Sequence, residues 1–144
     1  MGLELYNAPE GACGLVTSGG TESIFIACLA YRQQGRERGI TKPNIVCSNN
    51  THCGFDKACF YLGIEIRKVP LLPNFECDVE GIRSLIDSNT VALVTSSPDF
   101  SYGKYDPTNV IAAMAKEKGI GCHSDCCLGS FVGVFAEEAG FKQP

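Results

Sequence analysis

The alternation of short apolar runs with longer segments of helical periodicity constrains this chain more than any other feature of its sequence. Two apolar runs, Asn44–Ser48 and Val91–Thr95, have the length of short buried strands, and Ile120–Ser124 predicts a last strand. The segments between them repeat apolar residues every three or four positions, as amphipathic helices do. Strands that alternate with helices form βαβ units, in which the strands run parallel. We therefore predict an α/β fold with a mainly parallel sheet flanked by helices.

Several boundaries can be predicted from residues that start or end helices. Residues Ser23–Tyr31 are apolar almost all round, so they predict a buried helix that begins after Gly19-Gly20-Thr21 and ends near Gly39. Asp106 and Pro107 predict the N-cap and the first position of a later helix. The other predicted elements are a helix over about Cys53–Leu62, a strand over Glu65–Leu71 and a helix that Asp78 caps.

The composition excludes some partners and compartments. The 144 residues carry a formal charge of -4, which argues against nucleic acid as the main partner, because phosphate backbones need clustered Lys and Arg. No apolar run is long enough to cross a bilayer. The nine cysteines are odd in number, lie mostly in apolar runs and follow no secretory signal, so we expect reduced thiols in a cytoplasmic protein. An anchor that ties a longer parent protein to the endoplasmic reticulum membrane would lie outside these residues.

The segment Thr17–Ser23 is the first candidate for a binding function. Its sequence, Thr-Ser-Gly-Gly-Thr-Glu-Ser, opens the first long predicted helix. Glycines let the backbone approach an anion closely, and the free amides and dipole of a helix N-terminus favour a phosphate. The pattern is neither a Walker A loop nor the dinucleotide motif GxGxxG. Two interpretations stay open, a phosphate cradle and an ordinary glycine-rich turn with Thr or Ser as its cap.

Two further candidates stand at or just beyond the carboxyl ends of predicted strands, where open α/β sheets bind ligands. His52 could stack on another ring or exchange a proton near neutral pH, with a structural histidine as the alternative. Asp125 follows a predicted core strand, where a carboxylate is costly unless a cation or a hydrogen-bond donor meets it. The cysteines form no CxxC pair, so we expect no metal site.

Taken in this order, the three segments resemble the pyridoxal 5′-phosphate (PLP)-dependent lyases and decarboxylases of the aspartate aminotransferase fold, and most closely the sphingosine-1-phosphate lyases. The likeness runs through Cys13–Tyr31, Ile45–Val69, Ser97–Gly103 and His123–Phe135. So long a co-linear match is more specific than any single motif. The resemblance implies that residues 1–144 form an incomplete large, PLP-binding domain of this transferase-like fold.

The resemblance also assigns roles to individual residues. His52 would stack on the pyridine ring of PLP and Asp125 would pair with the ring nitrogen, so these two are the expected catalytic residues. PLP enzymes use such a carboxylate to keep the pyridine an electron sink. The other expected cofactor contacts are the phosphate-binding residues Gly19, Gly20 and Thr21, together with Cys127 of the Asp-Ala-Cys-Leu-Gly-Gly pattern.

The activity implied by the resemblance is the retro-aldol cleavage of a phosphorylated sphingoid base to a fatty aldehyde and phosphoethanolamine, carried out by a homodimer. The Pro98–Gly103 loop favours this lyase over the amino-acid decarboxylases, which usually carry a threonine-rich segment there. An amino-acid decarboxylase and a non-catalytic truncated paralogue are the alternatives.

Departures from the family pattern bear on these expectations. Cys126 replaces an alanine, Ser130 replaces a glycine, and Tyr102 stands where a histidine is common. The family attaches its cofactor to a lysine in a Ser/Thr-His-Lys segment, and the 144 residues contain no such segment. We therefore expect this chain alone to be inactive, with the lysine and a small domain supplied by further sequence.

Overall fold

Four parallel strands form one sheet in the computed structural model, which describes residues 2–142. The strand order is β2-β1-β3-β4, and each neighbouring pair is parallel. Parallel strands need crossover connections, and helices supply them here. The prediction of an α/β fold with a parallel sheet is confirmed. The strands are β1 (Asn44–Ser48), β2 (Glu65–Val69), β3 (Thr90–Ser96) and β4 (Gly121–Asp125).

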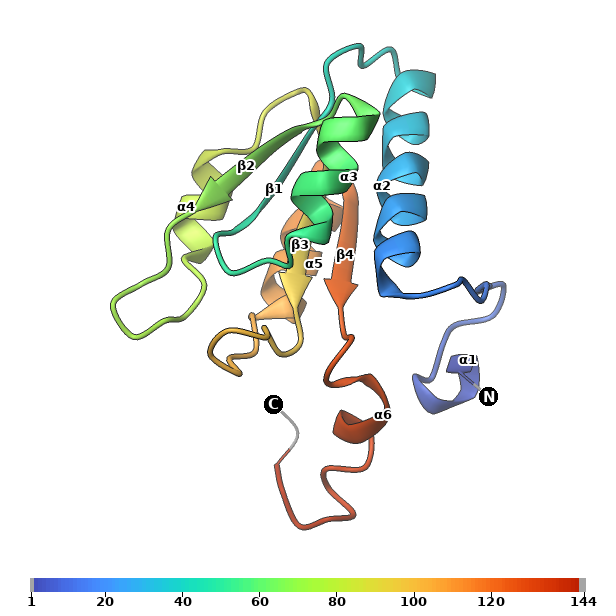
Figure 1. The fold of residues 1–144 in the computed structure, drawn as a ribbon, viewed down its shortest axis with the longest axis vertical. Helices are drawn as coiled ribbons and strands as arrows, with labels where there is room; N and C mark the ends of the chain where they lie inside the picture. Colours follow the sequence, from blue (N-terminus) through green and yellow to red (C-terminus); the bar gives the residue numbers. More distant parts are fainter. Residues whose placement is uncertain (1, 143–144) are drawn as a thin grey trace.

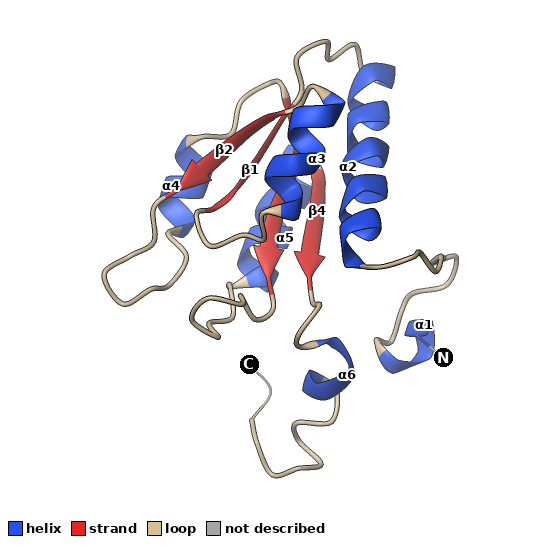
Figure 2. Cartoon of the chain, viewed as in Figure 1, coloured by secondary structure: helices blue, strands red, loops and turns tan. Residues whose placement is uncertain are grey.

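Helices cover both faces of the sheet, which is the middle of three layers (Figure 1). Helices α2 and α3 pack against one face, and α4 and α5 pack against the other. Two short helices, α1 and α6, lie beyond the carboxyl ends of β3 and β4 (Figure 2). The helix bounds are α1 (Gly2–Leu5), α2 (Gly20–Glu37), α3 (Gly54–Leu62), α4 (Val79–Ser84), α5 (Thr108–Lys118) and α6 (Ser130–Gly133).

The sheet divides the hydrophobic core into two parts. Along β1, Ile45 and Cys47 belong to the cluster beneath α2 and α3, whereas Val46 belongs to the cluster beneath α4 and α5. This alternation follows from the two-residue period of a strand. Both central strands, β1 and β3, are buried along their whole length, as expected for a parallel sheet between two helical layers.

Helix α2 departs from its prediction. Ile24 and Cys28 face the core, but Leu29 is 41% exposed, so the prediction of a helix buried all round is wrong. Only one face of α2 meets the sheet, and the apolar residues elsewhere around it remain at the surface. Its end agrees with expectation, because Gly39 has a φ of 82° in the left-handed region that glycine favours.

The start of α5 also differs from its prediction. The helix begins at Thr108, so Pro107 takes the N-cap position that was expected for Asp106. The Asp106 carboxylate instead accepts a hydrogen bond from the Ser96 amide at 2.7 Å. The Asp106 carboxylate therefore accepts a hydrogen bond from the last residue of β3, although the local pattern predicted that it would accept one from the start of α5.

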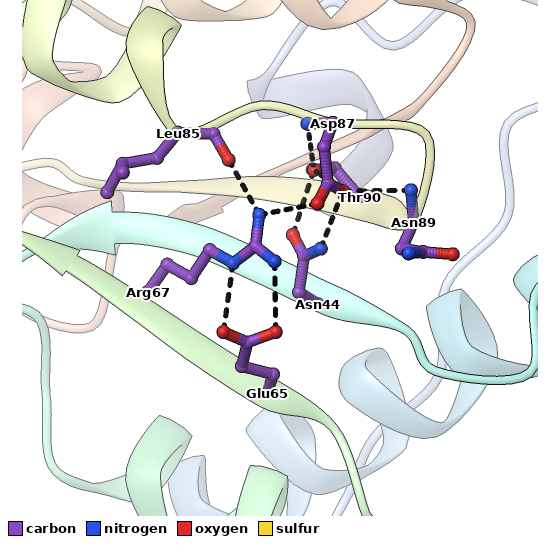
Figure 3. A network of polar contacts seen from close by, with 7 residues as sticks. All are labelled: Asn44, Glu65, Arg67, Leu85, Asp87, Asn89 and Thr90. Carbon is purple, nitrogen blue, oxygen red and sulfur yellow. Dashed lines mark hydrogen bonds and ion pairs between the residues drawn. The ribbon is translucent and has the colours of Figure 1, made fainter.

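A polar network joins three strands at the amino end of the sheet (Figure 3). Arg67 on β2 donates two hydrogen bonds of 3.0 Å to the Glu65 carboxylate and one of 2.8 Å to Asp87. Asp87 also accepts a 2.8 Å hydrogen bond from the side chain of the buried Asn44 on β1. The Thr90 hydroxyl on β3 donates to the Asn44 side-chain oxygen at 2.8 Å. Side chains thus reinforce the backbone pairing at this edge.

We expect Asp87→Ala to lower the free energy of unfolding by about 1–3 kcal/mol, because the buried Asn44 amide loses its acceptor. Hydrogen bonding by Asn44, followed by that of Arg67, lowers the pKa of Asp87 to about 2. The ionised carboxylate therefore stabilises the fold above about pH 4, and this contribution is lost as the pH falls towards 2. Urea unfolding of both proteins at pH 7 and pH 3 measures the effect.

The matched control is Glu80→Ala, which removes a carboxylate from an exposed ion pair with Arg83. Such pairs contribute less than about 1 kcal/mol, so this variant is expected to stay close to the parent protein. Equal losses of stability in the two variants would contradict the role given to the network.

No helix among residues 2–142 is long and apolar enough to cross a membrane.

Candidate functional site

The glycine-rich turn lies at the start of α2, at the same end of the sheet as the carboxyl ends of β3 and β4 (Figure 1). Gly19 has an extended backbone, and the Ser18 amide donates to the Glu22 carboxylate at 2.5 Å. The side chain and then the backbone amide of Ser18 lower the pKa of Glu22. The first amides of an α-helix have no acceptor within the helix. Those of Gly20 and Thr21 are therefore available to an anion.

His52 lies in the turn between β1 and α3. Its Nδ1 atom accepts a hydrogen bond from the Gly54 amide at 3.0 Å, so the neutral ring carries its proton on Nε2. The ring lies edge-on to Phe100, with the ring centroids 5.7 Å apart. A Cβ atom on Gly54 would lie 2.9 Å from both His52 Nδ1 and Ile24 Cδ1. Glycine at this position therefore lets the early part of α2 approach the His52 turn.

Asp125 is the last residue of β4, and alternation along this strand sets the direction of its side chain. His123 lies against Tyr31 of α2 and Phe55 of α3, with ring centroids 6.4 and 5.5 Å away. Residues two apart on a strand point to the same face, so Asp125 also faces the α2–α3 side. Burial lowers the pKa of His123, against the opposing effect of the Asp125 carboxylate. The imidazole beside Asp125 is therefore neutral at pH 7.

His52 and Asp125 line one cavity of about 230 Å³. Cys127 lies on its wall and donates its amide to Asp125 Oδ1 at 3.1 Å, which orients the carboxylate. The structure therefore brings three of the predicted site residues together. The predicted phosphate-binding residues Gly19, Gly20 and Thr21 do not line this cavity and lie at the same end of the sheet.

Other residues complete the cavity wall, and although the Pro98–Gly103 loop and the pattern around Cys127 were part of the resemblance, none of them was given a role of its own: Ser96, Pro98, Asp99, Phe100 and Leu128. Asp99 could have been found, because an aspartate followed closely by Ser and Gly is typical of a turn in which the carboxylate accepts backbone amides. Ser96 and Leu128 carry no such signal, since a serine at a strand end and a leucine in a turn are common. Their position depends on the folded chain.

Asp106 is hydrogen-bonded to Ser96, which lines the cavity, and its carboxyl group makes the stability of the fold depend on pH. Burial, partly offset by the hydrogen bond from Ser96 and reinforced by Asp99, raises the pKa of Asp106 to about 6. The folded state then binds this proton more tightly than the unfolded state between about pH 4 and pH 6. The stabilisation that protonated Asp106 gives the folded state therefore falls as the pH rises from about 4 to about 6.

We expect the protein to be less stable at pH 7.5 than at pH 5 by about 1–2 kcal/mol on account of Asp106, with solvent screening limiting the effect. Asp106→Asn keeps an acceptor for the Ser96 amide but has no proton to lose, so this difference is expected to shrink. Urea unfolding at both pH values measures it. An unchanged pH dependence in the variant would assign the effect to another group.

The thiols and carboxylates of residues 2–142 form no group of three or more His, Cys, Asp or Glu side chains that could hold a metal ion. All nine cysteines are free. Four of them lie in the core, two are partly buried and three are exposed: Cys28, Cys47, Cys59 and Cys77 are buried, Cys122 and Cys126 are intermediate, and Cys13, Cys53 and Cys127 are exposed.

Comparison with known proteins gives consistent matches along the chain. The model of the pyridoxal-dependent decarboxylase conserved domain matches residues 2–137. Sphingosine-1-phosphate lyase 1 of Mus musculus is 45% identical over 141 residues, which covers 98% of this chain and 25% of the mouse protein. The chain spans about a quarter of the length of the curated relatives it matches first.

Solved structures agree with the fold. The sphingosine-1-phosphate lyase of Burkholderia pseudomallei has a TM-score of 0.89 and 36% identity, over 97% of this chain and 33% of that one. The glutamate decarboxylase of Lactobacillus brevis has a TM-score of 0.82 and 23% identity, over 95% of this chain and 35% of that one. Because the glutamate decarboxylase is only 23% identical, its likeness to this chain shows a shared fold and nothing more. Together these matches confirm the fold class that the resemblance implied.

Proposed function

Because this chain belongs to the family of pyridoxal-dependent decarboxylases, we propose that it is part of a PLP-dependent lyase that cleaves a phosphorylated sphingoid base. The reaction breaks a carbon–carbon bond and releases a fatty aldehyde and phosphoethanolamine. Support comes from relatives named sphingosine-1-phosphate lyase, which align with nearly the whole chain at 45% identity in mouse and 41% in Saccharomyces cerevisiae.

The observation that carries this proposal is the meeting of an imidazole ring and a carboxylate in one cavity, at the end of the sheet where α2 begins. The residues present fit PLP, since they offer a flat ring, an acceptor for a ring nitrogen and free helix amides for a phosphate. The buried side chain of Asn50, two residues before His52, has no hydrogen-bond partner for either amide atom. Asn50 does not line the cavity, so the fit to PLP rests on His52, Asp125 and the helix amides.

Bound PLP supplies a pyridine ring that takes up the electron pair released by the breaking bond. In the proposed arrangement, Asp125 accepts a hydrogen bond from the ring nitrogen and holds a proton there. The Cys127 amide keeps the carboxylate in place. His52 would stack on the ring face, and the hydrogen bond that its Nδ1 accepts from the Gly54 amide limits rotation of the imidazole. The turn Gly19-Gly20-Thr21 would hold the phosphate, chiefly through the Gly20 and Thr21 amides, because the Gly19 amide already donates to Thr17 Oγ1.

Product analysis of the full-length protein tests the proposal. Protein reconstituted with PLP is incubated with a phosphorylated sphingoid base and, separately, with a panel of amino acids. Fatty aldehyde and phosphoethanolamine are expected from the first reaction, and no carbon dioxide from the second. Release of carbon dioxide without aldehyde would show that the protein is an amino-acid decarboxylase and not this lyase. The matching family model also supports that activity. PLP binding without either product would favour a non-catalytic paralogue.

We also propose that residues 1–144 are part of a large PLP-binding domain and that the complete protein is a cytoplasmic homodimer. Large apolar side chains are strongly exposed, among them Val16, Phe60, Phe131 and Val132, and contact with a second subunit would bury such surface. The nine free thiols support a reducing compartment. Light scattering of the complete protein is expected to give a dimer, and a monomer at micromolar concentration would contradict this assembly.

A further inference from the structure

The loop between β3 and α5 folds around a buried carboxylate. Asp99 is 1% exposed, and its two oxygens accept hydrogen bonds from three backbone amides. Ser101 and Tyr102 donate to Oδ1 at 2.8 Å each, and Lys104 donates to Oδ2 at 3.0 Å. The Asp99 amide donates in turn to the Lys104 carbonyl at 2.8 Å. Satisfying all three amides requires an acceptor at both oxygens, which a carboxylate provides and an amide side chain does not.

The outer side of this loop contacts the segment that follows β2. Phe75 and Tyr102 stack, with ring centroids 4.4 Å apart, and Lys104 Nζ lies 3.5 Å from the Glu76 carboxylate. Both charged groups are largely exposed, so this ion pair contributes little to stability. The buried hydrogen bonds to Asp99 are therefore the stronger restraint on the shape of the loop.

Phe100 is the side chain that this loop presents to the site. It follows Asp99 directly, and its ring packs edge-to-face with the His52 ring, with the ring centroids 5.7 Å apart. It also lines the same cavity as Asp125. Its side chain is 60% exposed, so burial in the core does not hold the ring in place. The position of Phe100 is set by the loop backbone, and Asp99 holds that backbone.

We propose that Asp99 is a positioning residue, which holds Phe100 against His52 and thereby fixes the orientation of the His52 ring. Asp99 acts through the loop backbone and the Phe100 ring. A small displacement of a catalytic or binding side chain can lower a rate or an affinity by a large factor. Residues that hold such a side chain in place therefore affect function. The effect on PLP rests on the proposed function, whereas the effect on the His52 ring does not depend on any cofactor.

The first test uses the full-length protein without PLP, with ¹³C-labelled histidine. The ring current of Phe100 shifts the Hε1 resonance of His52, so loss of the edge contact moves that signal. Phe100→Ala and Asp99→Ala are expected to move it to a similar extent, and the double variant to move it no further. Asp99→Asn keeps one acceptor oxygen for the Ser101 and Tyr102 amides, so its shift is expected to be smaller.

The second test measures the affinity for PLP. Asp99→Ala and Phe100→Ala are each expected to weaken binding about 10- to 100-fold, the loss seen when a supporting partner is removed at metal sites. Lys104→Ala is the matched control, because it removes the exposed ion pair with Glu76 and leaves Asp99 intact. Neither the His52 signal nor the affinity is expected to change in this control.

Two results would overturn the inference. One is a His52 signal that moves in Phe100→Ala but stays in place in a folded Asp99→Ala protein. If Asp99→Ala does not fold, Asp99→Asn decides instead: the Lys104 amide loses its acceptor, so a smaller but measurable shift is expected, and an unmoved His52 signal is the second result. Absence of PLP binding in the parent protein and in every variant would count against the proposed function, and the His52 signals would still decide the role of Asp99.

Discussion

Asp125→Asn is expected to lower the turnover of the full-length protein by about 100- to 1,000-fold, the loss typical of removing one preorganised electrostatic contact. Asparagine has nearly the same shape, and its side-chain oxygen can still accept the Cys127 amide. It lacks the negative charge that would keep the pyridine nitrogen of PLP protonated. Each unit lost from that pKa costs about 1.4 kcal/mol of stabilisation, so the rate falls with little change in fold. Steady-state turnover and the absorbance spectrum of bound PLP measure the effect.

Glu117→Gln provides a control for this variant. It removes a carboxylate near the end of α5, where Glu117 pairs weakly with Lys118 at 3.7 Å. Its turnover is expected to match that of the parent protein. Equal turnover in Asp125→Asn and Glu117→Gln would mean that the Asp125 carboxylate does not act on the cofactor.

Gly129→Ala is expected to destabilise the fold by about 1–3 kcal/mol through overpacking. A Cβ atom at Gly129 would collide with the Ser97 carbonyl oxygen and lie 2.9 Å from Pro98 Cδ. Neither atom belongs to the end of a flexible side chain, so the backbone of one segment has to move. Since Pro98 lines the cavity with His52 and Asp125, affinity for PLP is expected to fall as well. Thermal unfolding and a PLP titration measure the two effects.

Gly133→Ala is the matched control within α6. No atom lies within 4 Å of a Cβ at that position, and glycine is a poor helix former compared with alanine. Stability is expected to be unchanged or slightly higher. A loss of stability in Gly133→Ala as large as that in Gly129→Ala would show that α6 tolerates no alanine, and close contact at Gly129 would then not explain the loss.

The strands were the easiest elements to predict from the sequence. The run Asn44–Ser48 matches β1 at both ends, because its apolar centre, Ile45–Cys47, is flanked by the polar residues Asn44 and Ser48, where the strand begins and ends. Asp78 was likewise predicted as a cap, and its carboxylate accepts the Gly81 amide at 2.9 Å. The burial of α2 was predicted wrongly, because an apolar residue such as Leu29 looks the same in a sequence whether its surface faces the sheet or not.

The candidate site could be predicted in part. His52 and Asp125 were found because strand ends in parallel sheets are a general location for ligands, and the structure places both on one cavity. The contacts of Asp99 with Lys104 and of Asp106 with Ser96 were missed. Each depends on how a loop closes in space, and local propensity does not determine that. The roles of the predicted residues towards PLP stay predictions until the variants are measured.

The Arg67 network lies at the amino end of the sheet and the cavity lies at its carboxyl end. Substitutions in the loops that shape the cavity therefore leave the charged contacts that hold β1, β2 and β3 intact. A change at the cavity that leaves the backbone unstrained can thus alter the site while the amino end of the sheet keeps its polar contacts, whereas a change such as Gly129→Ala also lowers stability.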